Sequence, residues 1–247
     1  MRFYVDIPLA LHQQITLPEN VFHHWVRVLR AQQGDQATLF NGQGGEYQAT
    51  LTDIQKKSAK VLLSNFNALD RTPDYQVTLG QVMSKGDRID YAIQKATELG
   101  VHAIQLLVSE RCEMRLKYER DQKKIEHWQQ VAIAACEQCG MNRVPQILPP
   151  LSLQQWFEQL NTQQANLPFQ MQRLVLAPAQ QAVRITFKLP QSFALLIGPE
   201  GGLSDAEIEL AQSNDFKCWT LGERIFRTET APVAALSALL FAYSCHS

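Results

Sequence analysis

The chain has 247 residues, a length that fits one large domain or two modest ones. Hydrophobic residues make up 45% and charged residues 19%, which is ordinary for a globular protein and argues against a disordered chain or a coiled coil. Because 23 basic residues face 24 acidic ones, the net charge of -1 gives no support for nucleic-acid binding, which must rest on local patches.

Three features of the sequence bear on location. The longest apolar stretch, from Ala231 to Tyr243, is shorter than the roughly 20 residues that span a bilayer. Asp6 stands where a secretory signal would need an uninterrupted apolar core. Five cysteines are an odd number, unlike a secreted disulfide framework. We therefore expect a soluble, cytoplasmic protein with no membrane contact.

The first part of the chain contains short runs typical of strands, separated by turns that include Gly34-Asp35 and Gly44-Gly45. Such spacing predicts a small barrel or sandwich. The segment VFHHWVRVLR interrupts it and predicts one short helix, with Trp25, Val28 and Leu29 turned inward. Residues 71–74 predict a linker. The expected strands are 2–5, 36–41, 45–54 and 59–66.

After residue 74, expected strands alternate with expected helices, which predicts an α/β fold whose mostly parallel sheet is covered on both faces. The expected strands are 75–83, 102–108, 173–177, 192–198 and 216–221. The expected helices are 84–100, 118–138, 151–160, 203–211 and 231–243.

Caps and stops mark the ends of these helices. The capping-box spacing occurs three times, at Ser84 with Asp87, Ser152 with Gln155, and Ser204 with Glu207. Gly100 and Gly140 predict helix ends. Thr230 is expected to cap the last helix, with Pro232 in its first turn.

Ligands of open parallel sheets bind beyond the carboxyl ends of the strands, where three loops stand out: 174–178, 197–202 and 221–230. The second loop reads GPEGG, and its glycines let a ligand approach bare main chain. Its spacing matches neither the dinucleotide nor the P-loop fingerprint. Because the Glu200 carboxylate would repel phosphate, a cationic or neutral ligand such as S-adenosylmethionine (SAM) suits the loop better. A tight turn with a stray carboxylate is the alternative.

The third loop places Arg224, Arg227 and Glu229 directly before the very apolar helix expected at 231–243. Because such a helix must be buried, its N-terminus is expected to point into a partly enclosed site.

At these loops the sequence resembles a known family. LLIGPEGGLSDAEIELA followed by LGERIFRTETAPVAALSAL is similar to the RsmE family of bacterial 16S ribosomal RNA (uracil-N3) methyltransferases, in the SPOUT superfamily of knotted methyltransferases. The similarity extends to KGDRIDYAIQKATELGV, SERCEMR and ACEQCGMNRVP, and to VFHHWVRVLR with GDQATLFNGQGGEYQATL near the start. It therefore covers nearly the whole chain, in order. It implies a PUA-like β-barrel RNA-binding domain over 1–72 and a SPOUT methyltransferase domain with a C-terminal trefoil knot over 73–247. It also implies a homodimer, SAM as methyl donor, no metal, and 16S rRNA of the small ribosomal subunit as substrate.

The same resemblance assigns site residues. Cofactor binding falls to Leu176, Ala177 and Pro178, to Ile197, Gly198, Glu200, Gly201 and Gly202, and to Leu221, Gly222, Ile225, Arg227 and Thr228. Because uracil N3 must lose its proton, we expect Glu229 (or Glu98, or solvent) to take it and Arg227 to stabilise the resulting anion, with Arg143 and Arg111 as other candidates.

Family members commonly carry Arg where this chain has Met141, so Arg143 either supplies that charge or the arginine is dispensable. Cys136 and Cys139 have no second pair at zinc-ligand spacing and are interpreted as core thiols.

Two basic patches are candidates for phosphate. The first holds His23, His24, Arg27 and Arg30, and the second runs from Arg111 through Arg115 to Lys124. Each is also consistent with a solvated helix face. N3 is hidden in a paired base, so the target uridine is expected to be unpaired or flipped out, with Phe226 as a stacking face or simply part of the core.

Three rival hypotheses remain. The enzyme could modify a different target, such as a tRNA base or a ribose; the protein could be a catalytically silent RNA-binding or assembly factor, for which Met141 is the sequence hint; or it could be a dinucleotide-dependent oxidoreductase, which the missing glycine fingerprint disfavours.

Overall fold

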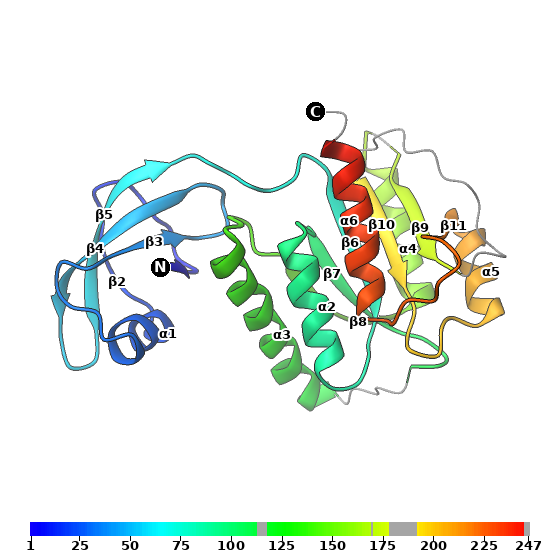
Figure 1. The fold of residues 1–247 in the computed structure, drawn as a ribbon, viewed down its shortest axis with the longest axis horizontal. Coiled ribbons are helices and arrows are strands. Elements are labelled where there is room, and N and C mark those ends of the chain that lie inside the picture. Colours follow the sequence, from blue (N-terminus) through cyan, green and yellow to red (C-terminus); the bar gives the residue numbers. More distant parts are fainter. Residues whose placement is uncertain (113–117, 169, 178–191, 245–247) are drawn as a thin grey trace. The chain divides into compact units, whose positions relative to one another are not determined.

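The computed structural model describes residues 1–112, 118–168, 170–177 and 192–244, and the chain divides into two compact units (Figure 1). The first unit is Met1–Thr72 with Ile133–Val144, and the second is Pro73–Ala132 with Pro145–Ser247. The sequence-based division at residues 72 and 73 had assigned the segment 133–144 to the second domain.

The first unit is built on a five-stranded sheet in the order β1-β3-β4-β5-β2. β1 pairs with β3 in parallel, and the other pairs are antiparallel. Inward side chains such as Leu39, Leu51, Val61 and Leu63 are at most 1% exposed and form its core. The strands are β1 Arg2–Tyr4, β2 Gln14–Thr16, β3 Gln36–Phe40, β4 Glu46–Ile54 and β5 Ala59–Asn67. The short strand β2 was not predicted.

The segment 133–144 includes the end of helix α3 (Tyr118–Cys139) and joins this sheet through hydrogen bonds that are buried or partly buried. Arg2 donates to the Cys136 carbonyl at 2.8 Å, and the Asn142 amide donates to the Gly45 carbonyl at 3.0 Å and to the Glu46 carboxylate at 3.1 Å. Burial tends to raise the pKa of Glu46, but hydrogen bonds from Arg2 and Asn142 and the nearby Arg71 outweigh it, and the pKa lies below its usual value. The ionised carboxylate therefore stabilises this corner of the first unit.

The segment expected as one helix is a short α1 (Glu19–Phe22) followed by a π-helix (His23–Val28). The Leu29 N–H donates to the His24 carbonyl at 3.0 Å, the i→i+5 pattern of a π-helix. Trp25 is buried as predicted, but the inward placement of Val28 and Leu29 was wrong, since they are 57% and 41% exposed. The wider turn places Val26 on the inner face instead, because the α-helical period used for the prediction does not apply here.

The second unit contains a six-stranded sheet in the order β11-β9-β10-β6-β7-β8, with every pair parallel. All six residues of β10 are buried, as expected of a strand covered on both faces. The strands are β6 Gln76–Val82, β7 Ala103–Val108, β8 Gln146–Ser152, β9 Gln172–Leu176, β10 Ser192–Ile197 and β11 Phe216–Trp219. Figure 1 shows α2 and α6 in front of this sheet and α4 behind it.

The helices of the second unit are α2 Asp87–Glu98, α4 Leu153–Ala165, α5 Asp205–Ser213 and α6 Thr230–Ser244, together with most of α3. The capping boxes at Ser152 and Ser204 are confirmed, with both reciprocal hydrogen bonds present. The box at Ser84 was wrong: Gly86, with φ of +65°, is the N-cap of α2, so Ser84 lies too early to cap it. Thr230 is likewise already inside α6 and does not precede it.

Candidate functional site

The sheet topology brings the three predicted cofactor loops to one edge. They follow β9, β10 and β11, which are neighbours in the order β11-β9-β10 and run in parallel, so their carboxyl ends meet. Beyond β10 lies β6. The chain leaves β10 toward β11 on one side of the sheet and leaves β6 toward β7 on the other side, so the direction of the connections reverses between β10 and β6. Such a switch point is where ligands of open α/β sheets bind. Leu176 ends β9 and the Ala177 N–H bonds to the Trp219 carbonyl at 3.0 Å, whereas Pro178 lies outside the described residues.

The GPEGG loop after β10 is a tight turn of mostly bare main chain. The Gly202 N–H donates to the Pro199 carbonyl at 2.9 Å, and Gly202 has a φ of +70°, which favours glycine. A Cβ on Gly198 would lie 3.0 Å from Leu203 Cγ and 3.2 Å from Leu203 N, so only glycine fits without movement. Gly201 and Gly202 are exposed, which leaves their main chain open to a ligand.

Two arginines hold this loop from outside it. Arg111 donates to the Gly201 carbonyl at 3.0 Å, and Arg88 of α2 pairs with the Glu200 carboxylate at 2.9 Å. Arg88 therefore offsets the negative charge of Glu200, which was the reason given from the sequence against a phosphate ligand. The exposed main chain of the loop is the better reason to expect a small neutral or cationic ligand. Sequence reasoning missed Arg88, although it lies in the KGDR stretch that carried part of the resemblance.

The loop after β11 is mostly exposed, with Leu221, Phe226 and Glu229 half-buried. Thr228 is its one buried residue and is 5% exposed. The Thr228 hydroxyl donates to the Gly198 carbonyl at 2.8 Å and accepts from the Gln81 amide at 3.2 Å, which joins the second and third loops to β6. Gly222 has a φ of +108°, while Ile225 is 93% exposed. Arg227 is also exposed, and its carbonyl accepts from the first N–H groups of α6.

Three buried side-chain oxygens lack a hydrogen-bond partner in the described part of the chain: Gln81 Oε1, Ser109 Oγ and Glu229 Oε2. Gln81 lies at the end of β6, Ser109 directly after β7 and Glu229 directly before α6, so all belong to the edge that carries the loops. Buried polar atoms normally have partners, so this edge offers acceptors to a ligand that brings donors. The expected cofactor fits this edge, since SAM carries an ammonium group and an adenine amine and has no phosphate.

The third catalytic candidate, Arg143, lies in the first unit, where its Nε is 2.9 Å from the Asp70 carboxylate. Met141 is 7% exposed and packs with Phe40 and Cys136, so in this chain it is a core residue. Burial raises the pKa of Cys136 to about 12, which keeps its thiol protonated and agrees with its interpretation as a core thiol.

The predicted RNA-binding residues of the first unit lie on or beside the π-helix, and His23, His24, Arg27 and Arg30 are all exposed. The Arg27 guanidinium lies 5.3 Å from the centre of the Phe22 ring and donates to the Lys56 carbonyl, which brings the basic turn at Lys56 and Lys57 beside the π-helix. In the second patch, Arg111 holds the GPEGG loop, and Arg115 lies outside the described residues.

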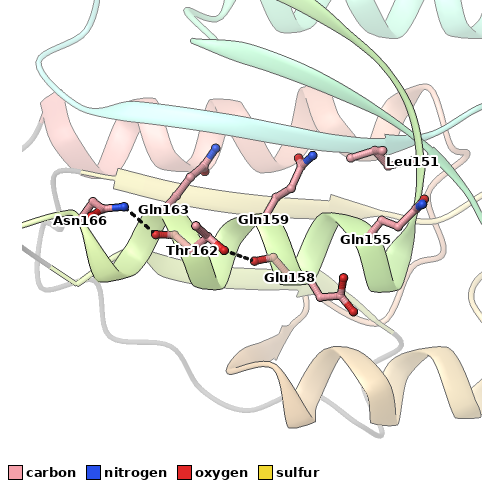
Figure 2. Close-up of a pocket in the computed structure, with 7 residues that line it drawn as sticks. All are labelled: Leu151, Gln155, Glu158, Gln159, Thr162, Gln163 and Asn166. Carbon is pink, nitrogen blue, oxygen red and sulfur yellow. Dashed lines mark hydrogen bonds between the residues drawn. The ribbon is translucent and has the colours of Figure 1, made fainter.

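A hollow on the outer side of α4 is a different place on the molecule. Figure 2 shows it lined by polar side chains of one face of the helix, with Leu151 beside them. None of the predicted site residues lines this hollow. In the ranges that the structure describes, no three His, Cys, Asp or Glu side chains gather as a metal site, and no helix is long and apolar enough to cross a membrane.

Comparison with known proteins places the chain in a family. The model of an RNA methyltransferase domain matches residues 71–240, and that of an RNA methyltransferase PUA domain matches residues 17–64. The ribosomal RNA small subunit methyltransferase E of Buchnera aphidicola (strain Sg) is 32% identical over 96% of this chain and 94% of its own length. The chain belongs to the ribosomal RNA small subunit methyltransferase E family. The protein of the same name from Bacillus subtilis is 33% identical over 89% of this chain and 86% of its own length.

Solved structures agree with this family assignment. The ribosomal RNA small subunit methyltransferase E of Neisseria gonorrhoeae, bound to S-adenosyl methionine, has a TM-score of 0.88 and 35% identity, covering 98% of this chain and 97% of that one. A Legionella pneumophila protein with bound SAM has a TM-score of 0.89 and 36% identity over the same shares. The resemblance stated from the sequence is thereby confirmed, as is the α/β fold with a PUA domain.

Proposed function

We propose that this protein transfers a methyl group from SAM to N3 of a uridine in 16S rRNA of the small ribosomal subunit. One observation carries the proposal: the loops after β9, β10 and β11 lie at the carboxyl edge of the parallel sheet, beside the switch point between β10 and β6, in a chain that belongs to a family of rRNA methyltransferases. The SAM-bound relatives support the same cofactor here.

The main chain of the three loops binds the cofactor in this proposal. SAM supplies an activated methyl group on a sulfonium. The exposed peptide groups of Gly201, Gly202 and Gly222 bind its adenine and ribose, and the apolar side chains of Leu176, Leu221 and Ile225 cover the ring. Positioning then contributes much of the rate, since well-oriented reactants lower a barrier by about 7–11 kcal/mol.

Glu229 and Arg227 provide the proton chemistry. Glu229 Oε2, which has no hydrogen-bond partner among the described residues, is an acceptor at the sheet edge and takes the N3 proton of uracil. The exposed Arg227 guanidinium stabilises the negative charge left on the ring oxygens. Arg143 is the weaker candidate, because Asp70 already binds its guanidinium.

The PUA domain provides the main RNA-binding surface in this proposal. His23, His24, Arg27 and Arg30 contact phosphates there, with Arg111 and Arg115 in the methyltransferase domain. The target uridine is unpaired or flipped out so that its N3 is reachable. We also propose domains over 1–72 and 73–247, with the segment 133–144 forming part of the first compact unit. A C-terminal trefoil knot, a homodimer and a cytoplasmic location complete the proposal.

The test is methylation of small ribosomal subunits from a strain that lacks this gene, with SAM labelled in its methyl group. Nucleoside mass spectrometry should show labelled N3-methyluridine in 16S rRNA. Label in a tRNA, on a ribose or on another base would refute the substrate, and binding of SAM without any transfer would favour the silent RNA-binding factor.

A further inference from the structure

We propose that Gln81 is a positioning residue that fixes the two cofactor loops relative to each other before SAM binds. The inference rests on the proposed SAM site and adds a residue of β6, a strand that contributes no loop to that site. It follows from a chain of hydrogen bonds that begins in the sheet and ends at the main chain of the GPEGG loop.

The sheet fixes the Gln81 side chain from both sides. Gln81 is 1% exposed and pairs with Ile197 of β10 and Leu106 of β7. A Cβ on the preceding residue, Gly80, would lie 2.3 Å from the Trp156 ring of α4, so Gly80 faces α4. Because successive strand residues face opposite sides, Gln81 points to the side that α6 covers.

The amide of Gln81 connects three segments. Its Nε2 donates to the Val82 carbonyl at 3.0 Å and to the Thr228 hydroxyl at 3.2 Å. The Thr228 hydroxyl in turn donates to the Gly198 carbonyl at 2.8 Å. Gln81 therefore orients the Thr228 hydroxyl, and Thr228 holds the first peptide of the GPEGG loop against the loop that precedes α6.

Gln81 Oε1 is buried and has no partner among the described residues. An amide placed only to complete the sheet would be expected to satisfy both its ends, because buried polar atoms normally do. Nε2 of the same amide contacts Thr228, so this oxygen belongs to the edge where the ligand is proposed to bind, and it can accept a hydrogen bond from the ligand.

Gln105 is a matched control on the neighbouring strand. It is 2% exposed, and its Nε2 donates to the Leu106 carbonyl at 3.1 Å, as that of Gln81 does to Val82. Its second acceptor is the Pro149 carbonyl on β8, away from both cofactor loops. Gln81→Met and Gln105→Met thus remove the same buried amide, and only the first removes a contact to a cofactor loop.

Calorimetry with SAM tests the inference on the full chain. We expect the dissociation constant of Gln81→Met to rise about tenfold, equivalent to about 1.4 kcal/mol, and that of Gln105→Met to stay within about twofold of wild type. The KM for SAM should rise with little change in kcat. Thr228→Val should weaken binding by a similar factor, and the double variant should lose no more than the larger single loss, because both act through one chain of bonds.

Hydrogen exchange tests the same contact without ligand. The N–H groups of Gly202, Thr230 and Ala231 are bonded within the two loops, and should exchange faster in Gln81→Met but not in Gln105→Met. Unchanged binding and exchange in Gln81→Met, or additive losses in the double variant, would overturn the inference. If Gln81→Met does not fold, Gln81→Asn, which is one methylene shorter, should show the same losses. A wild-type protein that binds no SAM would refute the proposed function instead, while the exchange measurement still decides the role of Gln81.

Discussion

Alanine substitutions at Gly198 and Gly201 test whether the GPEGG loop needs glycine at each position because there is no room for a Cβ. A Cβ on Gly198 would lie 3.0 Å from Leu203 Cγ and 3.2 Å from Leu203 N, about 0.4 Å inside an ordinary contact for the closer atom. A Cβ on Gly201 would lie 3.5 Å from Arg111 Cβ, an ordinary distance, and Gly201 is not among the residues with positive φ. One substitution therefore strains the loop, and the other fits it.

The expected magnitudes follow from this difference. Overpacking costs typically about 1–3 kcal/mol, and each kcal/mol shifts the Tm of a protein of this size by about 2–4 °C. We expect Gly198→Ala to lower the Tm by several degrees. Gly201→Ala should leave it nearly unchanged or raise it slightly, because alanine restricts the unfolded chain.

Thermal unfolding followed by circular dichroism measures the Tm of wild type and of both variants, and calorimetry on the same samples measures their SAM binding. Because the Gly198 carbonyl is the acceptor of Thr228, Gly198→Ala should also weaken SAM binding. Equal Tm values for the two variants, or a larger loss in Gly201→Ala, would refute the packing argument.

Three further predictions concern other parts of the molecule. Arg30→Gln should reduce the slope of log K against log salt for rRNA binding by about one, because one phosphate contact is lost. Lys95→Ala is the control and should leave the slope unchanged, because the Lys95 ammonium pairs with Glu98 on α2. Equal slopes in wild type and both variants would contradict an RNA contact at Arg30. The pKa of Glu46 is lowered in the folded state, so the stabilisation is present above the ordinary pKa of an unfolded glutamate and is lost as the pH falls through the lower folded value. The Tm of Glu46→Gln should therefore fall less steeply on acidification than that of wild type. Glu209→Gln, at an exposed position on α5, should follow wild type. Gly80→Ala should lower the Tm strongly, because the new Cβ would lie 2.3 Å from the Trp156 ring. The same substitution should lower the Tm less when Trp156 is replaced by Leu. An equal loss of Tm with either residue at position 156 would show that Trp156 is not the cause.

Local signals allowed much of the fold to be predicted. The Ser152 and Ser204 capping boxes and the glycines after α2 and α3 depend on a few neighbouring residues, and they appear in the structure where the sequence places them. The three cofactor loops were found because each follows an apolar run that ends in glycine or proline. Their meeting at one edge depends on the strand order β11-β9-β10, which no local pattern encodes.

The misses also have physical reasons. β8 was not predicted from the sequence, because it contains Pro149 and Pro150 and proline argues against a strand. β8 lies at the edge of the sheet, where proline is tolerated. The π-helix shifted the inward face at Val28, because hydrophobic periodicity assumes α-helical turns. Gln81 was overlooked because its partner in the cofactor loop, Thr228, lies 147 residues further along the chain. A glutamine inside an apolar strand, next to the carboxyl end of that strand, is a signal that could have identified it.

The most direct test of the central claim is an experimental structure of this protein with SAM bound. We predict SAM in contact with the main chain of residues 197–202 and 221–228, with the Thr228 hydroxyl still bonded to the Gly198 carbonyl. SAM bound elsewhere, such as in the hollow beside α4, with these two loops free of ligand, would contradict the account.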